Sequence, residues 1–184
     1  GVCSLTLTEG QNINFAIPVS ELPPVLDKAL ALERALRNPN DSNMPVEAIA
    51  ALIRKQRERG DFQSASQLAE RALKTHPKNI ALLLEAAETA FSRGSLPLVH
   101  SLIERITSIA PRNAPALQIS AAAMAEEGNC DAAVVQAQAA LDAGGLESSQ
   151  ACEAHAILGE CLGREGRAKE ALVHVERALT SPAV

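Results

Sequence analysis

Apolar residues recur at helical spacing in two runs within residues 46–79, with Gly60 between the runs. The apolar positions are Ile49, Leu52 and Ile53 in the first run, and Ala65, Leu68, Ala69, Ala72 and Leu73 in the second. Such spacing places each set on one face of a helix. Asp61 can cap the second helix, and His76 followed by Pro77 ends it, because proline cannot continue a helix. The segment therefore predicts two helices joined by a tight turn.

The same pattern returns with a period of 34 residues. Gly60, Gly94 and Gly128 are separated by this period, and so are Pro77 and Pro111. A single pair of helices leaves one apolar side uncovered, and stacked copies of the pair cover it. The period therefore predicts an all-α array of helical hairpins.

The fourth unit departs from the period. Gly166 follows Gly128 by 38 residues, as if four residues were inserted. The third unit ends in Gly144 and Gly145 where the first two units have proline. We expect the extra residues to lengthen the loop before Cys152.

The array resembles tetratricopeptide (TPR) repeats, which are helical hairpins of 34 residues with small or apolar side chains at fixed positions and a proline near the end. In the first two copies these positions hold Ile49, Leu52, Ile53, Gln56, Ala65, Ala69, Ala72 and Pro77, then Leu83, Ala86, Ala87, Ala90, Val99, Ile103, Ile106 and Pro111. In the last two copies they hold Leu117, Ser120, Ala121, Met124, Ala133, Ala137 and Ala140, then His155, Leu158, Gly159, Leu162, Ala171, Val175 and Ala178. The resemblance implies a right-handed α-α superhelix of about four hairpins, with repeats at residues 46–79, 80–113, 114–147 and 152–184.

The second repeat distributes side-chain volume between its two helices differently from the family pattern. Val99 and Ile106 are bulky where the family has small residues, whereas Ala86, Ala87 and Ala90 are small on the first helix. Because total volume is kept, we expect this helix pair to close. The sequence has no Trp and no Tyr, so the packing must rely on aliphatic side chains and alanine.

Residues 1–45 precede the repeats. β-branched and apolar residues around positions 2–8 and 13–17 predict two short strands with a turn between them, and a stripe of leucine and valine predicts a linking helix at residues 20–37. A polar linker, residues 38–45, follows.

The N-terminal strands resemble the end of a trypsin-like serine protease domain of the bacterial HtrA-like type. The resemblance rests on Gly1-Val2 and on the run Asn14-Phe15-Ala16-Ile17-Pro18, followed by a helix. It implies that residues 1–19 are a protease remnant, that the catalytic triad lies upstream, and that the location is the cell envelope. No triad residue is carried onto this sequence. The alternative is that these residues are only an N-terminal extension.

Composition excludes several functions. The net charge is -5 and three Phe are the aromatic residues, so we expect no nucleic-acid binding. No apolar run approaches the roughly 20 residues of a membrane span, and no signal-peptide pattern is present. We therefore expect no membrane insertion in this segment.

The sequence predicts no catalytic residue, metal site or cofactor. Cys152, His155 and Cys161 come closest to a ligand cluster, but nine residues of helix put the two sulfurs on opposite sides. Cys130 and Cys161 can approach each other across two helices, and buried free thiols are the favoured interpretation. No serine has a neighbouring base and orienting group.

A concave peptide-binding groove is the function that the TPR resemblance implies, with the first helix of each repeat lining it. The candidate residues are Ala50, Arg54, Arg57, Leu84, Glu85, Glu88, Phe91, Gln118, Ala122, Glu126, Glu160 and Arg164. Ala50 and Arg54 stand where chaperone-binding members have Lys and Asn, so a clamp for acidic C-terminal tails is not expected. An apolar floor, basic at Arg54 and Arg57 and acidic beyond, favours an extended or helical peptide with apolar side chains and some positive charge. The alternative is that these charges form only a solvated face.

Three functions stay open: a binding module attached to a protease, a passive end of a serine endopeptidase, and a stand-alone assembly scaffold. Leu172 and Leu179 lie where a further helix would pack, as Val134 and Leu141 do for the fourth repeat. We therefore expect that repeats continue beyond Val184 or that this end self-associates. The N-terminal strands offer a second route to a homo-oligomer.

Overall fold

The computed structural model describes residues 2–5, 15–18 and 44–180. The chain divides into two compact units, Gly1–Leu52 and Ile53–Val184. In the first unit, β1 (Val2–Leu5) and β2 (Phe15–Pro18) pair antiparallel, with Val2 opposite Pro18. The predicted turn of this hairpin, the linking helix at residues 20–37 and most of the linker lie outside the described residues.

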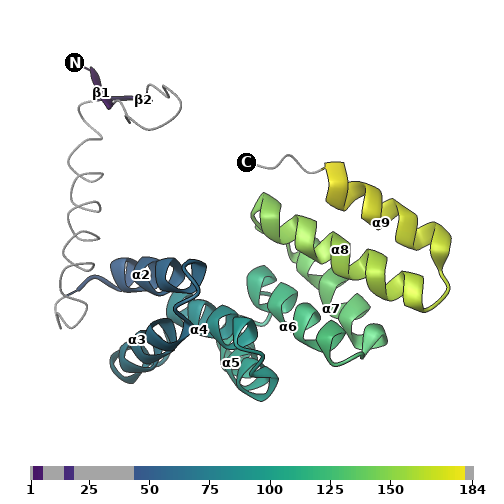
Figure 1. Ribbon diagram of the computed structural model, residues 1–184, viewed down its shortest axis with the longest axis horizontal. Coiled ribbons are helices and arrows are strands. Elements are labelled where there is room, and N and C mark those ends of the chain that lie inside the picture. The colour runs from purple at the N-terminus through teal and green to yellow at the C-terminus, as the bar shows by residue number, and fades with distance from the viewer. Residues whose placement is uncertain (1, 6–14, 19–43, 181–184) are drawn as a thin grey trace. The chain divides into compact units, whose positions relative to one another are not determined.

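Eight helices make up the described residues from 44 to 180, which are all-α (Figure 1). The helices are α2 (Val46–Glu58), α3 (Phe62–Thr75), α4 (Ile80–Ser92), α5 (Leu96–Ile109), α6 (Ala114–Glu126), α7 (Cys130–Ala143), α8 (Ser148–Arg164) and α9 (Ala168–Thr180). Within the same residues, no helix is both long enough and apolar enough to cross a bilayer.

A glycine separates the two helices of each hairpin, and a side chain caps the second helix in the first and third hairpins. Gly60, Gly94, Gly128 and Gly166 have φ between 70° and 78°, a conformation that residues with a Cβ rarely adopt. Asp61 then caps α3, because its Oδ1 accepts a hydrogen bond from the Ser64 N–H at 3.1 Å. The predicted sequence of helix, tight turn and helix is confirmed.

In the second unit, each helix from α3 to α9 packs against the next one in the chain. The first helices of the hairpins also pack side by side, α4 on α6 and α6 on α8. These two sets of contacts produce two layers, and the layer of first helices carries the candidate site.

The core is aliphatic, as the composition requires. Val99 and Ile106 are fully buried, and Ala86, Ala87 and Ala90 are buried on the facing helix, so the expected exchange of volume in the second repeat is confirmed. The last hairpin packs in the same way. Val134 and Leu141 of α7 contact a cluster containing Leu158, Leu162 and Ala171.

The prediction that four extra residues lengthen a loop is wrong. They extend α8, which begins at Ser148 and has 17 residues where the other helices have 13 or 14. A Gln three residues after the N-cap explains this start, since Gln150 Oε1 accepts a hydrogen bond from the Glu147 N–H at 3.2 Å.

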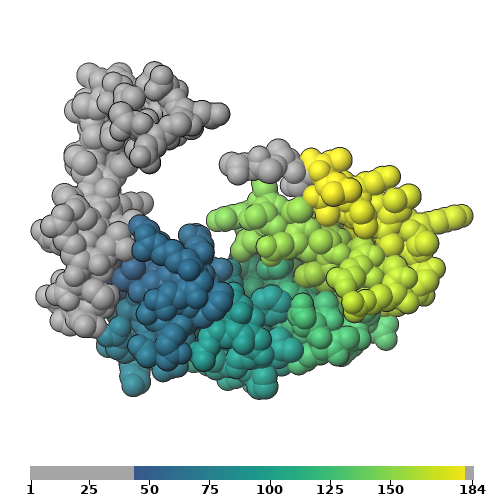
Figure 2. Space-filling view, viewed as in Figure 1, coloured from purple at the N-terminus to yellow at the C-terminus, as the bar shows by residue number. Residues whose placement is uncertain are grey.

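One face of α9 is apolar and open to solvent. Figure 2 shows the last part of the chain, in yellow, at the surface. Leu172 is 58% exposed and Leu179 is 80% exposed, and Val173 and Val175 are exposed beside them. The two leucines therefore lie uncovered, at the positions that the sequence assigned to contact with a further helix.

Candidate functional site

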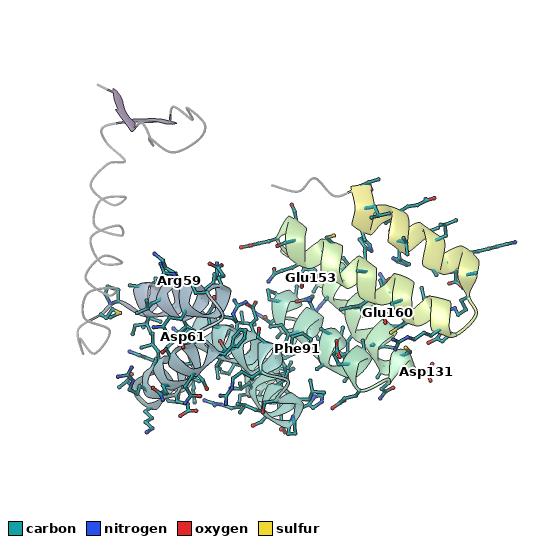
Figure 3. The ribbon with its side chains drawn as sticks, in the orientation of Figure 1. Arg59, Asp61, Phe91, Asp131, Glu153 and Glu160 are labelled. Carbon is teal, nitrogen blue, oxygen red and sulfur yellow. The ribbon has the colours of Figure 1, made fainter. Side chains whose placement is uncertain are left out.

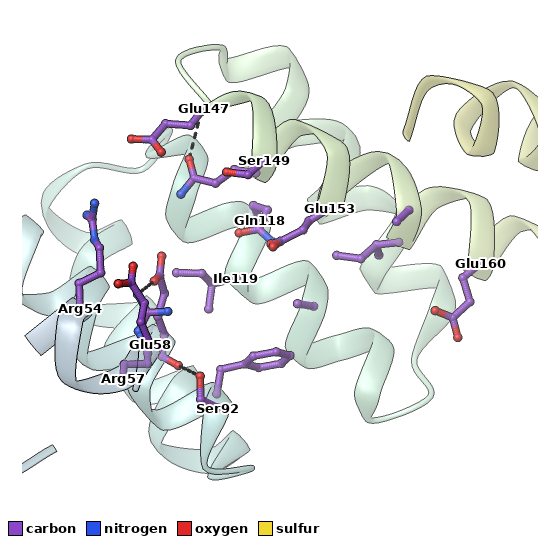
Figure 4. A pocket seen from close by; sticks show the side chains of 16 residues that line it. Arg54, Arg57, Glu58, Ser92, Gln118, Ile119, Glu147, Ser149, Glu153 and Glu160 are labelled. Atoms are coloured by element: carbon purple, nitrogen blue, oxygen red, sulfur yellow. Dashed lines mark hydrogen bonds and ion pairs between the residues drawn. The ribbon is translucent and has the colours of Figure 1, made fainter. Parts of the chain in front are cut away.

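A groove with a volume of about 600 Å³ runs along the layer of first helices (Figure 4). One wall comes from the end of α2 and the other from glutamates of α8 and its N-cap, and side chains of α4, α6 and α8 form the floor between them. We call the first the α2 wall (Arg54, Arg57 and Glu58) and the second the α8 wall (Glu147, Glu153 and Glu160).

Seven of the residues predicted from the sequence line this groove: Arg54, Arg57, Glu88, Phe91, Gln118, Ala122 and Glu160. Five others lie outside its lining. Ala50 is buried, Leu84 is half-buried, Glu85 is buried behind the α2 wall, and Glu126 and Arg164 are exposed near the helix ends.

The two arginines of the α2 wall are held by carboxylates. Glu85 is 4% exposed, and its Oε1 accepts hydrogen bonds from Arg54 Nε at 2.9 Å and from Arg54 Nη2 at 2.6 Å. Its Oε2 accepts from Arg57 Nη2 at 3.2 Å, and Arg57 also pairs with Glu88. The end of the groove that the sequence suggested to be basic is therefore neutralised.

The electrostatics of this cluster follow from burial. Desolvation raises the pKa of Glu88 above its ordinary value, and the nearby Glu85 adds to the effect, while Arg57 opposes it. Hydrogen bonds to Glu85 raise the pKa of Arg54. The cluster joins α2 to α4.

Besides Glu88, Ser92 and Gln118, the groove floor contains small and aliphatic side chains and one aromatic ring. Phe91 comes from the end of α4, Ile119 and Ala122 come from α6, and Ala156 and Ile157 come from α8. Phe91, Ala122 and Ile157 are partly exposed, so a bound segment could cover them.

The α8 wall is acidic. Figure 3 shows Glu153 and Glu160 along α8, across the groove from α4. Glu153 Oε2 accepts a hydrogen bond from Gln118 Nε2 at 2.9 Å, and Glu160 Oε1 accepts from Arg164 Nη2 at 2.6 Å. Two arginines and five glutamates line the whole groove, which gives its lining a net charge of -3.

Nine lining residues are not among the twelve candidates: Glu58, Ser92, Ile119, Glu147, Ser149, Gln150, Glu153, Ala156 and Ile157. Three of them belong to the N-terminal end of α8, which the sequence placed in a loop. The spacing of Gln150 after Glu147 was the available signal for an earlier helix start.

Outside the groove, two side-chain pairs have chemical interest. His155 Nδ1 and His174 Nδ1 lie 3.0 Å apart, a pair that helical periodicity within one segment does not reveal.

Cys161 is buried and hydrogen-bonds Cys130, so the predicted approach of these cysteines is confirmed. Desolvation, with a smaller contribution from Cys130, raises the pKa of Cys161 to about 12, which keeps it a thiol. In the described part of the chain, no group of three or more His, Cys, Asp or Glu could hold a metal ion.

A family model described as "Tetratricopeptide repeat" matches residues 56–125. Residues 56–125 therefore have the sequence pattern of tetratricopeptide repeats.

Solved structures with the same fold span most of the chain. A thermophilic TPR protein of Thermus thermophilus is 25% identical, with a TM-score of 0.65 over 88% of this chain and 87% of that one. MamA from Desulfovibrio magneticus RS-1 is 18% identical, with a TM-score of 0.64 over 84% of this chain and 92% of that one. The MamA likeness shows the fold alone. A comparison with curated protein sequences finds no significant match.

Proposed function

We propose that the TPR unit is a protein-interaction scaffold that holds a partner segment in the groove between the α2 and α8 walls. The observation that carries this proposal is the groove itself: partly exposed apolar side chains lie on its floor, and the charges of its whole lining sum to -3. A segment with apolar side chains and positive charge complements both features. The scaffold needs no catalytic group for this role.

A steric block of the groove tests the proposal. Ala122 is small, partly exposed and central to the floor, so Ala122→Arg places a long side chain in the groove without disturbing the buried core. Val135 is 64% exposed on α7 and does not line the groove, so Val135→Arg is the matched control. Circular dichroism checks that both variants keep the helical fold.

Peptides are first selected from a displayed library against the full chain, and their affinities are then measured with each variant. Ala122→Arg should weaken the selected peptides by at least about tenfold, roughly the loss of one well-packed contact, and Val135→Arg should leave them unchanged. Equal affinity for both variants would show that the peptides bind elsewhere, and the groove would lose its assigned role.

We also propose that the TPR unit is attached to a trypsin-like protease domain, for which it recruits substrates or partners. The support is the resemblance of residues 1–18 to the end of such a domain. The coding sequence upstream of Gly1 tests this: a Gly-x-Ser-Gly-Gly motif, and labelling of the whole gene product by a fluorophosphonate, are expected. Without both, a stand-alone assembly scaffold is the better account.

A further inference from the structure

The spacing of carboxylates on α8 narrows the kind of partner that the groove accepts. Glu153 and Glu160 are both exposed, both line the groove, and lie seven residues apart on one helix. Seven residues bring a helix back to nearly the same face after a rise of about 10.5 Å. Ala156 and Ile157 lie between the two carboxylates and line the groove with them.

An extended peptide matches this spacing poorly. Side chains on one face of a strand are about 6.8 or 13.6 Å apart, because alternate residues point to opposite faces at about 3.4 Å per residue. Residues i and i+7 of a partner helix lie on one face at about 10.5 Å, the same separation as the two glutamates. A helix can therefore oppose both carboxylates with two cations while its apolar residues cover the floor.

The polar groups of the groove favour a helix for a second reason. The Gln118 amide donates to Glu153, and Ser92 Oγ donates to the Glu88 carbonyl at 2.9 Å. These groups are already engaged, and the other side chains between the walls include the apolar residues Phe91, Ile119, Ala122, Ala156 and Ile157. An extended backbone lying there would lose hydrogen bonds to water with little replacement, but a helix satisfies its own backbone groups.

We infer that the groove binds an amphipathic α-helix whose apolar stripe is flanked by Lys or Arg residues at positions i and i+7, which lie against Glu153 and Glu160. This inference rests on the proposed function, because it specifies the occupant of the same groove. Glu85 and Glu88 offset the charges of Arg54 and Arg57, and Glu58 lies on the same wall, so the α2 wall has no net positive charge that would attract an acidic helix.

The probes are four synthetic peptides of equal length. The first has a leucine stripe flanked by Lys at i and i+7, and the second has Glu in place of these two Lys. The third moves the second Lys to the opposite face of the helix, and the fourth has a central Pro. Binding to the full chain is measured by fluorescence anisotropy at low and at high salt.

We expect the first peptide to bind most tightly and to weaken with salt, since exposed charges are screened. Glu153→Gln combined with Glu160→Gln should weaken it by about three- to tenfold, the range expected for two exposed ion pairs. Glu104→Gln, an exposed carboxylate on α5 outside the groove, is the matched control and should have no effect. The Pro peptide should lose at least about tenfold, because proline breaks the helix.

Equal binding of the Pro peptide, or an unchanged affinity in the double variant, would overturn the inference. Failure of the inference and failure of the proposed function are separable. If Ala122→Arg still excludes library-selected peptides while the four probes show no dependence on charge or helicity, only the helix assignment falls. If Ala122→Arg leaves every peptide bound, the groove itself is the wrong site.

Discussion

The buried carboxylate behind the α2 wall gives the sharpest test of how the groove is held in shape. The side chain of Glu85 is 5% exposed and contacts two arginines, of which Arg57 is 19% exposed and Arg54 is 55% exposed. Removing one partner of a buried ion pair costs about 3–5 kcal/mol when the other charge is left without compensation. Here Arg54 can turn to water and Arg57 keeps Glu88, so the cost should fall below that range.

We therefore expect Glu85→Ala to lower the free energy of unfolding by about 2–3 kcal/mol. Glu85→Gln keeps the shape and one acceptor, and should cost about 1–2 kcal/mol. Urea unfolding at neutral pH, followed by circular dichroism, measures both. The control is Glu160→Gln, which removes an exposed pair between residues one turn apart that is worth at most about 0.5 kcal/mol. If Glu85→Gln were as harmless as this control, the cluster would not be what joins α2 to α4.

Three further predictions concern the hairpins. A Cβ at Gly159 would lie 2.6 Å from Val175 Cγ2. Gly159→Ala should therefore lower the free energy of unfolding in urea by about 1 kcal/mol, a net value that includes the gain in helix propensity. Adding Val175→Ala should restore most of this loss of stability. Burial lowers the pKa of His155 and of His174 below 6.5, so the unfolded state binds more protons. Stability should be full above that pH and fall as the pH drops below it, and a variant with Gln at both positions should show a flatter pH profile. Asn79→Ala removes the cap whose Oδ1 accepts from the Leu82 N–H at 3.1 Å, and should lower the melting temperature by an amount equivalent to about 1 kcal/mol.

Local patterns were sufficient to predict the hairpins. A glycine that must adopt positive φ, followed by Asp61 or by a capping asparagine as in Asn129, marks a turn through forces acting within a few residues. The extra four residues before Cys152 were misassigned because the period of the array gave no information on whether an insertion continues the helix. Gln150, paired with Glu147, held that information locally.

The groove was harder to predict than the fold. Repeat positions identified Arg54 and Arg57 as lining residues, but they could not show that Glu85 lies buried between the two arginines. This pairing joins residues about one repeat apart, and it neutralises the positive charge that a partner would otherwise meet on that wall. The pair formed by His155 and His174 likewise depends on how two helices pack. Both features belong to tertiary contacts, which helical periodicity does not encode.

The central claim is that partners bind in the groove between the α2 and α8 walls. Isoleucine-methyl NMR tests it directly, because Ile119 and Ile157 line the groove, whereas Ile109 is 43% exposed on α5 outside it. Titration with a library-selected peptide should shift the methyl signals of Ile119 and Ile157 and leave that of Ile109 in place. Shifts confined to Ile109, with the two groove signals unmoved at saturation, would contradict the account.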